Sequence, residues 1–135
     1  LIDQQLPQID FLDINGESVK MDKADLTVIC FWNRHCRPCI RELTALDILS
    51  EEYPNVQFVA FTPDFQEEVL KLIDRLNLKW ENITIVPGYD EEVTDVLKIF
   101  VYPSNAIVDR EMVIKEVTIG GDTRKLLRSL EKLSN

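Results

Sequence analysis

Continuous apolar segments alternate with amphipathic ones along the first part of the chain. Residues 26–32 and 56–62 are runs of apolar and β-branched residues, which predict two strands buried on both faces of a sheet. Leucines recur at helical spacing between these strands, and residues 66–78 have an amphipathic helical pattern. The expected inward positions are Leu43, Leu46, Leu49 and Tyr53 in the first helix and Val69, Leu70, Ile73 and Leu76 in the second.

Turn residues divide the rest of the chain into shorter elements. Residues 83–86 predict a third strand that stops at Pro87-Gly88, and residues 90–99 predict a short helix. The other expected elements are a small hairpin between 9–12 and 18–21 around Asn15-Gly16, strands at 104–109 and 112–119 around Asp109-Arg110-Glu111, and a last helix that follows the candidate cap Asp122 and carries Leu126, Leu127, Leu130 and Leu133. Strands separated by helices predict a parallel sheet core, to which the late hairpin adds antiparallel strands.

Length and composition fit one α/β domain over residues 1–135. The chain is 45% hydrophobic and 29% charged, a balance typical of globular domains. Its net charge of −9 argues against a nucleic-acid partner, because phosphate binding needs a basic face. No run approaches the ~20 apolar residues that a membrane span needs, so the domain itself is not expected to cross a membrane. The start at Leu1 is compatible with a targeting or anchoring segment that has been removed.

Cys36 and Cys39 stand three residues apart where the strand over 26–32 gives way to a helix. This spacing brings the two thiols onto one face of the first helical turn, close enough to join. A thiol at a helix N-terminus lies near unpaired N–H groups, which favour the thiolate. Three arginines and one glutamate between residues 33 and 42 also make this segment locally basic. We therefore expect the pKa of Cys36 to be lower than that of a free cysteine.

A zinc site and a structural bridge are the other uses of such a cysteine pair. Zinc normally takes four nitrogen or sulfur ligands, but the chain has no second CxxC, and its only histidine, His35, is adjacent to Cys36. A bridge between Cys36 and Cys39 closes a very short loop and stabilises little. Redox chemistry without a metal or other cofactor is therefore the favoured interpretation. Cys30 is expected to be an inert thiol within the buried strand.

The sequence around the cysteines resembles the thioredoxin superfamily, and within it the TlpA/ResA-like thiol–disulfide oxidoreductases. Residues 28–39 (Val-Ile-Cys-Phe-Trp-Asn-Arg-His-Cys-Arg-Pro-Cys) are similar to the apolar strand, Phe-Trp pair and Cys-x-Pro-Cys of that branch. Residues 7–16 resemble its N-terminal hairpin, and residues 104–119 resemble its closing strand pair. The resemblance implies a thioredoxin fold with an N-terminal β-hairpin and a central mixed sheet flanked by helices.

Two further site residues follow from this resemblance. Pro103 matches the cis-proline that faces the cysteines, which would leave the backbone of Tyr102 free to pair with an extended substrate. The alternative is a trans-proline at a strand entry. Glu42 matches the glutamate beneath the active site and would exchange a proton with Cys39, one helical turn before it. The alternative is a glutamate placed near the helix start only because the dipole favours it.

Trp32 and His35 complete the expected substrate-binding residues. The resemblance implies that Trp32 packs beside the active site, and the alternative is an ordinary core aromatic. His35 either tunes Cys36 or is a solvent-facing histidine at the rim. The branch often has tryptophan where this chain has His35, and threonine is common where this chain has Tyr102. These departures bear on the choice of partner more than on the fold or the reaction.

The resemblance also implies a reaction, a dithiol–disulfide exchange. Cys36 attacks a partner disulfide, and Cys39 resolves the mixed disulfide that forms. The expected partners are client proteins with thiols or disulfides, of which apocytochrome c is typical for the branch, and an upstream electron donor. The expected location is extracytoplasmic, either periplasmic or membrane-anchored.

Two other functions fit parts of the pattern. A thioredoxin-like binding or chaperone module would use its cysteines only to sense redox state. A peroxide reductase would share the fold, but Trp32 and Asn33 do not fit the Pro and Thr of the peroxiredoxin motif Pro-x-x-x-Thr-x-x-Cys. Exchange with protein disulfides is therefore the favoured function.

Overall fold

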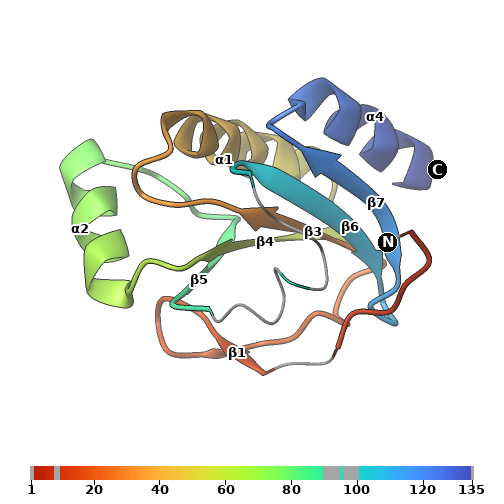
Figure 1. Ribbon diagram of the computed structural model, residues 1–135, viewed down its shortest axis with the longest axis horizontal. Helices are drawn as coiled ribbons and strands as arrows, with labels where there is room; N and C mark the ends of the chain where they lie inside the picture. The colour runs from red at the N-terminus through yellow and green to blue at the C-terminus, as the bar shows by residue number, and fades with distance from the viewer. Residues whose placement is uncertain (1, 8–9, 90–94, 96–100, 135) are drawn as a thin grey trace.

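A five-stranded mixed sheet forms the centre of the molecule, and helices line one of its faces (Figure 1). The structure is a computed structural model that describes residues 2–7, 10–89, 95 and 101–134. The strands, in their order across the sheet, are β5 (Thr84–Pro87), β4 (Val56–Thr62), β3 (Leu26–Phe31), β6 (Ser104–Asp109) and β7 (Ile114–Ile119). The pairs β5–β4 and β4–β3 are parallel, whereas β3–β6 and β6–β7 are antiparallel. The predicted mixed sheet is thus confirmed.

The predicted strand bounds hold best in the middle of the sheet. β4 and β6 have the predicted ends, and β3 stops one residue early, at Phe31. All six side chains of β3 are buried, because this strand has a neighbour on each side and covered faces above and below. At the margins, β5 extends to include Pro87, which an edge strand tolerates. β7 begins two residues late, at Ile114, after Met112 adopts left-handed backbone with φ 65°.

Helices α1 (Arg37–Leu49), α2 (Gln66–Leu76) and α4 (Thr123–Ser134) pack against the same face of the sheet (Figure 1). A 3₁₀ turn, η1 (Ser50–Glu52), follows α1. The side chains that form this core are Val28, Cys30 and Trp32 from β3 and its end, Cys39, Leu43 and Leu46 from α1, Val69 and Leu72 from α2, and Leu126 and Leu130 from α4. The predicted cap of the last helix is confirmed, because Asp122 Oδ1 accepts the backbone N–H of Lys125 at 3.1 Å.

The prediction for α2 is confirmed for Val69 and Ile73, which pack in the core, and is wrong for Leu70, for Leu76 and for the end of the helix. Val69 and Leu72 are buried, whereas Leu70 and Leu76 are 47% and 46% exposed. The sheet contacts only a narrow stripe of this helix, so the apolar positions beside the stripe stay in solvent. The helix ends at Leu76 rather than at 78, because Asn77 takes a left-handed conformation with φ 52° that closes it.

The opposite face of the sheet is covered by the N-terminal part of the chain. The predicted small hairpin is confirmed as an antiparallel pair, β1 (Phe11–Leu12) and β2 (Ser18–Val19). Phe11 packs edge-on against Phe61 of β4 with ring centroids 4.7 Å apart. The other buried side chains of this second core include Leu6, Ile29, Phe31, Val59, Val86, Ala106, Val108 and Met112. The predicted helix over 90–99 lies, apart from Asp95, outside the described residues.

Candidate active site

The two cysteines of the motif form a disulfide at the start of α1. Cys36 is the N-cap residue of this helix, Cys39 lies in its first turn, and their Cα atoms are 5.2 Å apart. Cys36 Sγ also accepts the backbone N–H of Cys39 at 3.2 Å, an interaction that a capping side-chain oxygen usually makes. Cys36 is partly exposed, whereas Cys39 has no exposed surface. The predicted strand–CxxC–helix arrangement is thus confirmed, and the two sulfurs differ in access.

A buried carboxylate, Glu42, lies one helical turn after Cys39 and is 6% exposed. Its Oε1 accepts Nδ2–H of Asn105 in β6 at 2.8 Å, and its Oε2 accepts the hydroxyl of Thr123 at the start of α4 at 2.9 Å. Both donors are uncharged, and Glu42 makes no ion pair with any residue that the structure describes. Glu42, Asn105 and Thr123 are called the Glu42 cluster below.

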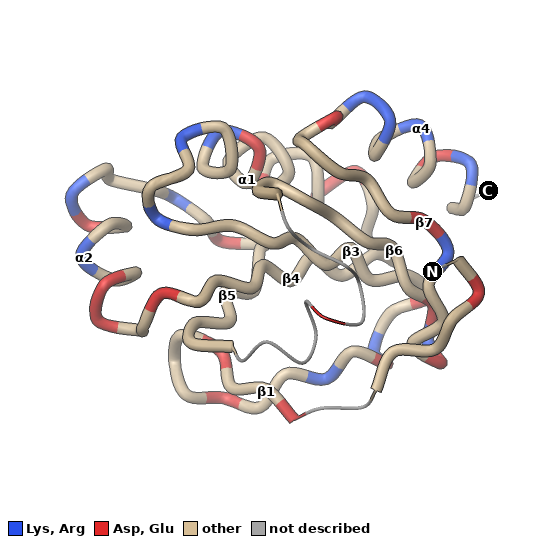
Figure 2. Tube along the Cα trace, viewed as in Figure 1, with Lys and Arg blue, Asp and Glu red and all other residues tan. Residues whose placement is uncertain are grey.

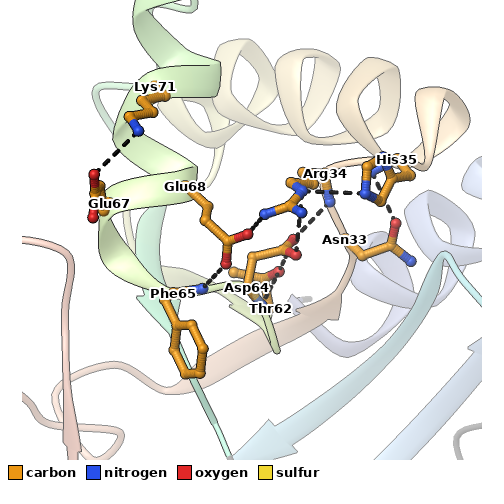
Figure 3. Close-up of polar contacts among 9 residues, drawn as sticks. All are labelled: Asn33, Arg34, His35, Thr62, Asp64, Phe65, Glu67, Glu68 and Lys71. Carbon is orange, nitrogen blue, oxygen red and sulfur yellow. Dashed lines mark hydrogen bonds and ion pairs between the residues drawn. The ribbon is translucent and has the colours of Figure 1, made fainter.

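A second polar cluster connects the loop before the disulfide to α2 (Figure 3). Asp64 Oδ2 accepts the backbone N–H of Arg34 at 2.7 Å and the hydroxyl of Thr62 at 2.8 Å. The guanidinium of Arg34 forms an ion pair with Glu68 of α2, and its Nε donates to Nε2 of His35 at 3.1 Å. Arg34, His35, Asp64 and Glu68 are called the Arg34 cluster below. It holds the active-site loop against the N-terminus of α2.

The peptide bond between Tyr102 and Pro103 is cis, as the resemblance implied. Pro103 is buried, and Tyr102 is partly buried with its hydroxyl 2.8 Å from that of Tyr89. Burial, and then the hydrogen bond with Tyr102, raises the pKa of Tyr89 well above its usual value. A cleft of about 330 Å³ opens beside the proline. Its lining includes Pro38, Arg41, Glu42, Pro103, Gly121 and Thr123.

Gly121 brings the start of α4 into close approach with Pro103. A Cβ atom at this position would stand 2.9 Å from Pro103 Cγ, and the residue has a φ of +75°. Both features require glycine, because any side chain would meet the proline ring and strain the backbone. This close approach accompanies the contact of Thr123, two residues later, with the Glu42 carboxylate.

Two residues near the disulfide are fully enclosed. Trp32 has no exposed surface and packs edge-on against Trp80, with ring centroids 5.3 Å apart. The predicted contact between Trp32 and a substrate stays a prediction. Cys30, the free thiol of β3, is 1% exposed. Burial, and to a smaller extent the charge of Glu42, raises the pKa of Cys30 well above its ordinary value, which suits an inert core thiol.

Nothing in the described part of the chain gathers three or more His, Cys, Asp or Glu side chains in a position to hold a metal ion. None of the described helices is long and apolar enough to cross a membrane. Figure 2 shows that basic and acidic residues both occur along α1, α2 and α4.

Sequence reasoning missed the partners of the site residues. Asn105 lies within a predicted buried strand, where an amide among apolar residues was a signal that it meets a polar group. Asp64 follows a predicted strand and precedes a predicted helix, a common place for polar contacts. Thr123 has no local signal, because only the folded chain brings it to Glu42, 81 residues away in sequence.

Comparison with known proteins gives relatives for this arrangement. Residues 2–117 match the sequence model of the AhpC/TSA family. The thioredoxin-like protein YneN of Bacillus subtilis is 26% identical over 129 residues, which cover 90% of this chain and 74% of that protein. The thiol–disulfide oxidoreductase ResA of Halalkalibacterium halodurans is 27% identical over 126 residues, 90% of this chain and 70% of ResA. The thioredoxin domain of a thiol–disulfide oxidoreductase from Bacteroides vulgatus superposes with a TM-score of 0.75 at 24% identity, over 100% of this chain and 99% of that domain, which shows the thioredoxin fold.

Proposed function

This chain belongs to the AhpC/TSA family and is a thiol–disulfide oxidoreductase, and we propose that Cys36 is its attacking thiol and Cys39 its resolving thiol. The difference in access between the two sulfurs carries this proposal. Cys36 is partly exposed at the helix start, whereas Cys39 is fully buried and can meet only a sulfur already bound to Cys36. The order of attack then follows from geometry, because a client disulfide reaches one thiol and not the other.

The helix start also supports Cys36 as a nucleophile. In the reduced protein its sulfur would remain at the N-cap of α1, where the N–H of Cys39 points at it. Donors and the positive end of the helix dipole stabilise a thiolate there. A lowered pKa of the reduced Cys36 thiol accordingly stays our prediction.

Glu42 is proposed as the group that takes the proton from Cys39 when this thiol attacks the mixed disulfide. Its burial near Cys39 supports this role. So does the lack of an ion-pair partner among the described residues, since a carboxylate that no cation neutralises is a competent proton acceptor. After the transfer, the Cys39 thiolate displaces the client sulfur from Cys36, and the client leaves reduced by two electrons.

The client is proposed to approach over the rim of the disulfide. His35 is exposed on one side of Cys36, and the Tyr102–Pro103 turn and its cleft lie beside the start of α1. The backbone of Tyr102 is the proposed partner of an extended client segment, as in strand addition. Trp32 is buried in the same core cluster as Cys39, and its proposed role is to support the disulfide from within the protein.

Client proteins with disulfides and an upstream dithiol donor are the proposed partners, and the proposed location is outside the cytoplasm. The resemblance to ResA-like proteins supports both points, since reduction of protein disulfides is needed where disulfides form. Apocytochrome c is a client of the expected kind.

Reduction of insulin disulfides tests the assignment of the thiols. We expect Cys36→Ser to lose the activity to background, because no accessible nucleophile remains. Cys30→Ser is the matched control and keeps the activity, since Cys30 is buried and outside the disulfide. Cys39→Ser is expected to trap clients as Cys36-linked mixed disulfides. Activity that survives Cys36→Ser, or a Cys39→Ser protein that traps nothing, would overturn the proposal.

The same preparations separate the other functions. A redox-sensing binding module would hold clients without reducing insulin, and its binding would survive Cys36→Ser. A peroxide reductase would consume peroxide with a Cys36-dependent rate that exceeds its rate with insulin. We expect neither result.

A further inference from the structure

Thr123 is the member of the Glu42 cluster whose hydrogen bonding can change without movement of any heavy atom. Its hydroxyl donates to Glu42 Oε2 at 2.9 Å and has a second acceptor, the carbonyl oxygen of Gly121, at 3.4 Å. A hydroxyl carries one hydrogen and also accepts. Rotation of that hydrogen toward Gly121 therefore turns Thr123 from a donor to Glu42 into an acceptor from it.

Asn105 lacks this freedom. Its Nδ2 donates to Glu42 Oε1, and an amide nitrogen only donates. Asn105 is fully buried in β6, and its Oδ1 has no hydrogen-bond partner within the described part of the chain. To accept a proton from Glu42, the whole amide plane would have to turn over inside the core. Asn105 therefore donates to Oε1 in either form of the carboxyl group but cannot accept its proton, whereas Thr123 donates to the ionised form and accepts from the protonated one.

The surroundings of Glu42 leave one thiol to exchange a proton with it. Cys39 precedes it by one turn on α1, while Cys30 on β3 is buried and keeps its proton. Arg41 lines the cleft that reaches Glu42 from solvent, and Asp122 on the α4 side is engaged in capping that helix. The carboxylate thus lies between a buried proton source and an open route to solvent.

We propose that Thr123 is a positioning residue that lets Glu42 take up the proton of Cys39 and release it to solvent with its carboxylate held in place. This inference rests on the proposed role of Glu42. The Cys39 S–H proton passes to the carboxylate, and the Cys39 thiolate attacks Cys36 Sγ. The Cys36–Cys39 bond forms as the bond from Cys36 to the client sulfur breaks, and the client leaves as a thiolate with that electron pair. Thr123 meanwhile turns its hydrogen to Gly121 and accepts the new O–H.

The test follows the two thiol steps separately in single turnovers. Reduced protein is mixed with an equimolar aromatic disulfide, dithionitrobenzoate, whose thiolate product is coloured. The first release reports attack by Cys36, and the second reports resolution by Cys39. Both rates are measured across a pH series for the wild type, Thr123→Val and Thr123→Ser. Valine keeps the shape without the hydroxyl, and serine keeps the hydroxyl.

We expect Thr123→Val to slow the second release about tenfold at acidic pH and to move its half-maximal rate up by about one pH unit, because the ionised carboxylate loses a donor. The first release stays unchanged, which shows that the variant is folded and that Cys36 is unaffected. Thr123→Ser behaves as the wild type in both releases.

A Glu42→Gln variant separates failure of this inference from failure of the function on which it rests. We expect it to slow the second release about a hundredfold. If it leaves the second release unchanged, the proposed role of Glu42 is wrong, and the role of Thr123 falls with it. If Glu42→Gln slows this step but Thr123→Val equals Thr123→Ser, or if both releases slow together in Thr123→Val, only the role of Thr123 is overturned.

Discussion

The Glu42 cluster and the Arg34 cluster lie on opposite sides of the central strand β3, and they hold their carboxylates by different means. Glu42 is 6% exposed and is held by two uncharged donors. The side chains of Asp64 and Glu68 are 13% and 36% exposed, and both face the guanidinium of Arg34. Only hydrogen bonds offset the desolvation of a buried carboxylate that has no cationic partner, whereas an ion pair near solvent is screened by water and salt.

This difference matches the two halves of the disulfide. The Arg34 cluster precedes Cys36 and anchors its loop to α2, so the attacking thiol is placed by contacts close to solvent (Figure 3). The Glu42 cluster follows Cys39 and links α1 to β6 and α4 inside the protein. We therefore expect the free energy of unfolding to be more sensitive to changes in the Glu42 cluster than in the Arg34 cluster.

The largest effect is expected for Asn105→Ala. This change leaves Glu42 Oε1 without its donor in a buried site, and hydrogen bonds to charged groups contribute about 1.5–3 kcal/mol. We expect urea unfolding to show a loss of about 3 kcal/mol, because a small cavity adds to the lost bond.

Thr118→Val is the matched control for Asn105→Ala. Thr118 pairs with Asn105 across β6 and β7, and its buried hydroxyl has no partner within the described part of the chain. Replacing an unpaired buried hydroxyl by a methyl group is expected to be neutral or slightly stabilising. If both variants lose the same free energy of unfolding, the hydrogen bond from Asn105 to Glu42 does not contribute the predicted stability.

The contrast also shows what could be predicted from the sequence. A continuous apolar run predicted β4 to the residue, since a strand buried on both faces has one dominant pattern, and the hairpin turn at Asp109-Arg110-Glu111 predicted the bounds of β6. The cysteine spacing predicted the disulfide at the start of α1. In α2 the inward positions Leu70 and Leu76 were predicted wrongly, because an amphipathic pattern does not show how much of the apolar stripe the sheet covers.

The partners in both clusters could not be predicted, for a physical reason. Glu42 meets Asn105 through the register of β6 against β3 and meets Thr123 through the docking of α4, contacts 63 and 81 residues apart in sequence. Arg34 meets Asp64 across the parallel pairing of β3 with β4, 30 residues on. Local periodicity carries no information on contacts between residues so far apart in sequence. The family resemblance identified Glu42 as a site residue but did not identify the residues that donate hydrogen bonds to it.

An intermediate effect is expected for Asp64→Ala. This change removes the acceptor for the backbone N–H of Arg34 and for the hydroxyl of Thr62, in a site that water partly reaches. We expect a loss of about 1–2 kcal/mol in the free energy of unfolding, measured in urea. Asp64→Asn keeps an oxygen acceptor and should recover at least half of the loss. If Asp64→Asn and Asp64→Ala are equally unstable, the charge of Asp64 matters and its hydrogen bonds do not.

The smallest effect is expected for Arg34→Gln. The ion pair of Arg34 with Glu68 is about one-third exposed at each side chain, and exposed pairs contribute roughly 0–1 kcal/mol, with screening by salt. The backbone N–H of residue 34 still donates to Asp64 in this variant, so the loop keeps its anchor. We expect a loss of about 0.5 kcal/mol in urea unfolding at low salt, and none in 1 M salt. Lys71→Gln, which breaks the exposed pair with Glu67, should behave in the same way. A salt-independent loss as large as that of Asp64→Ala would mean that the guanidinium, and not the backbone, anchors the active-site loop.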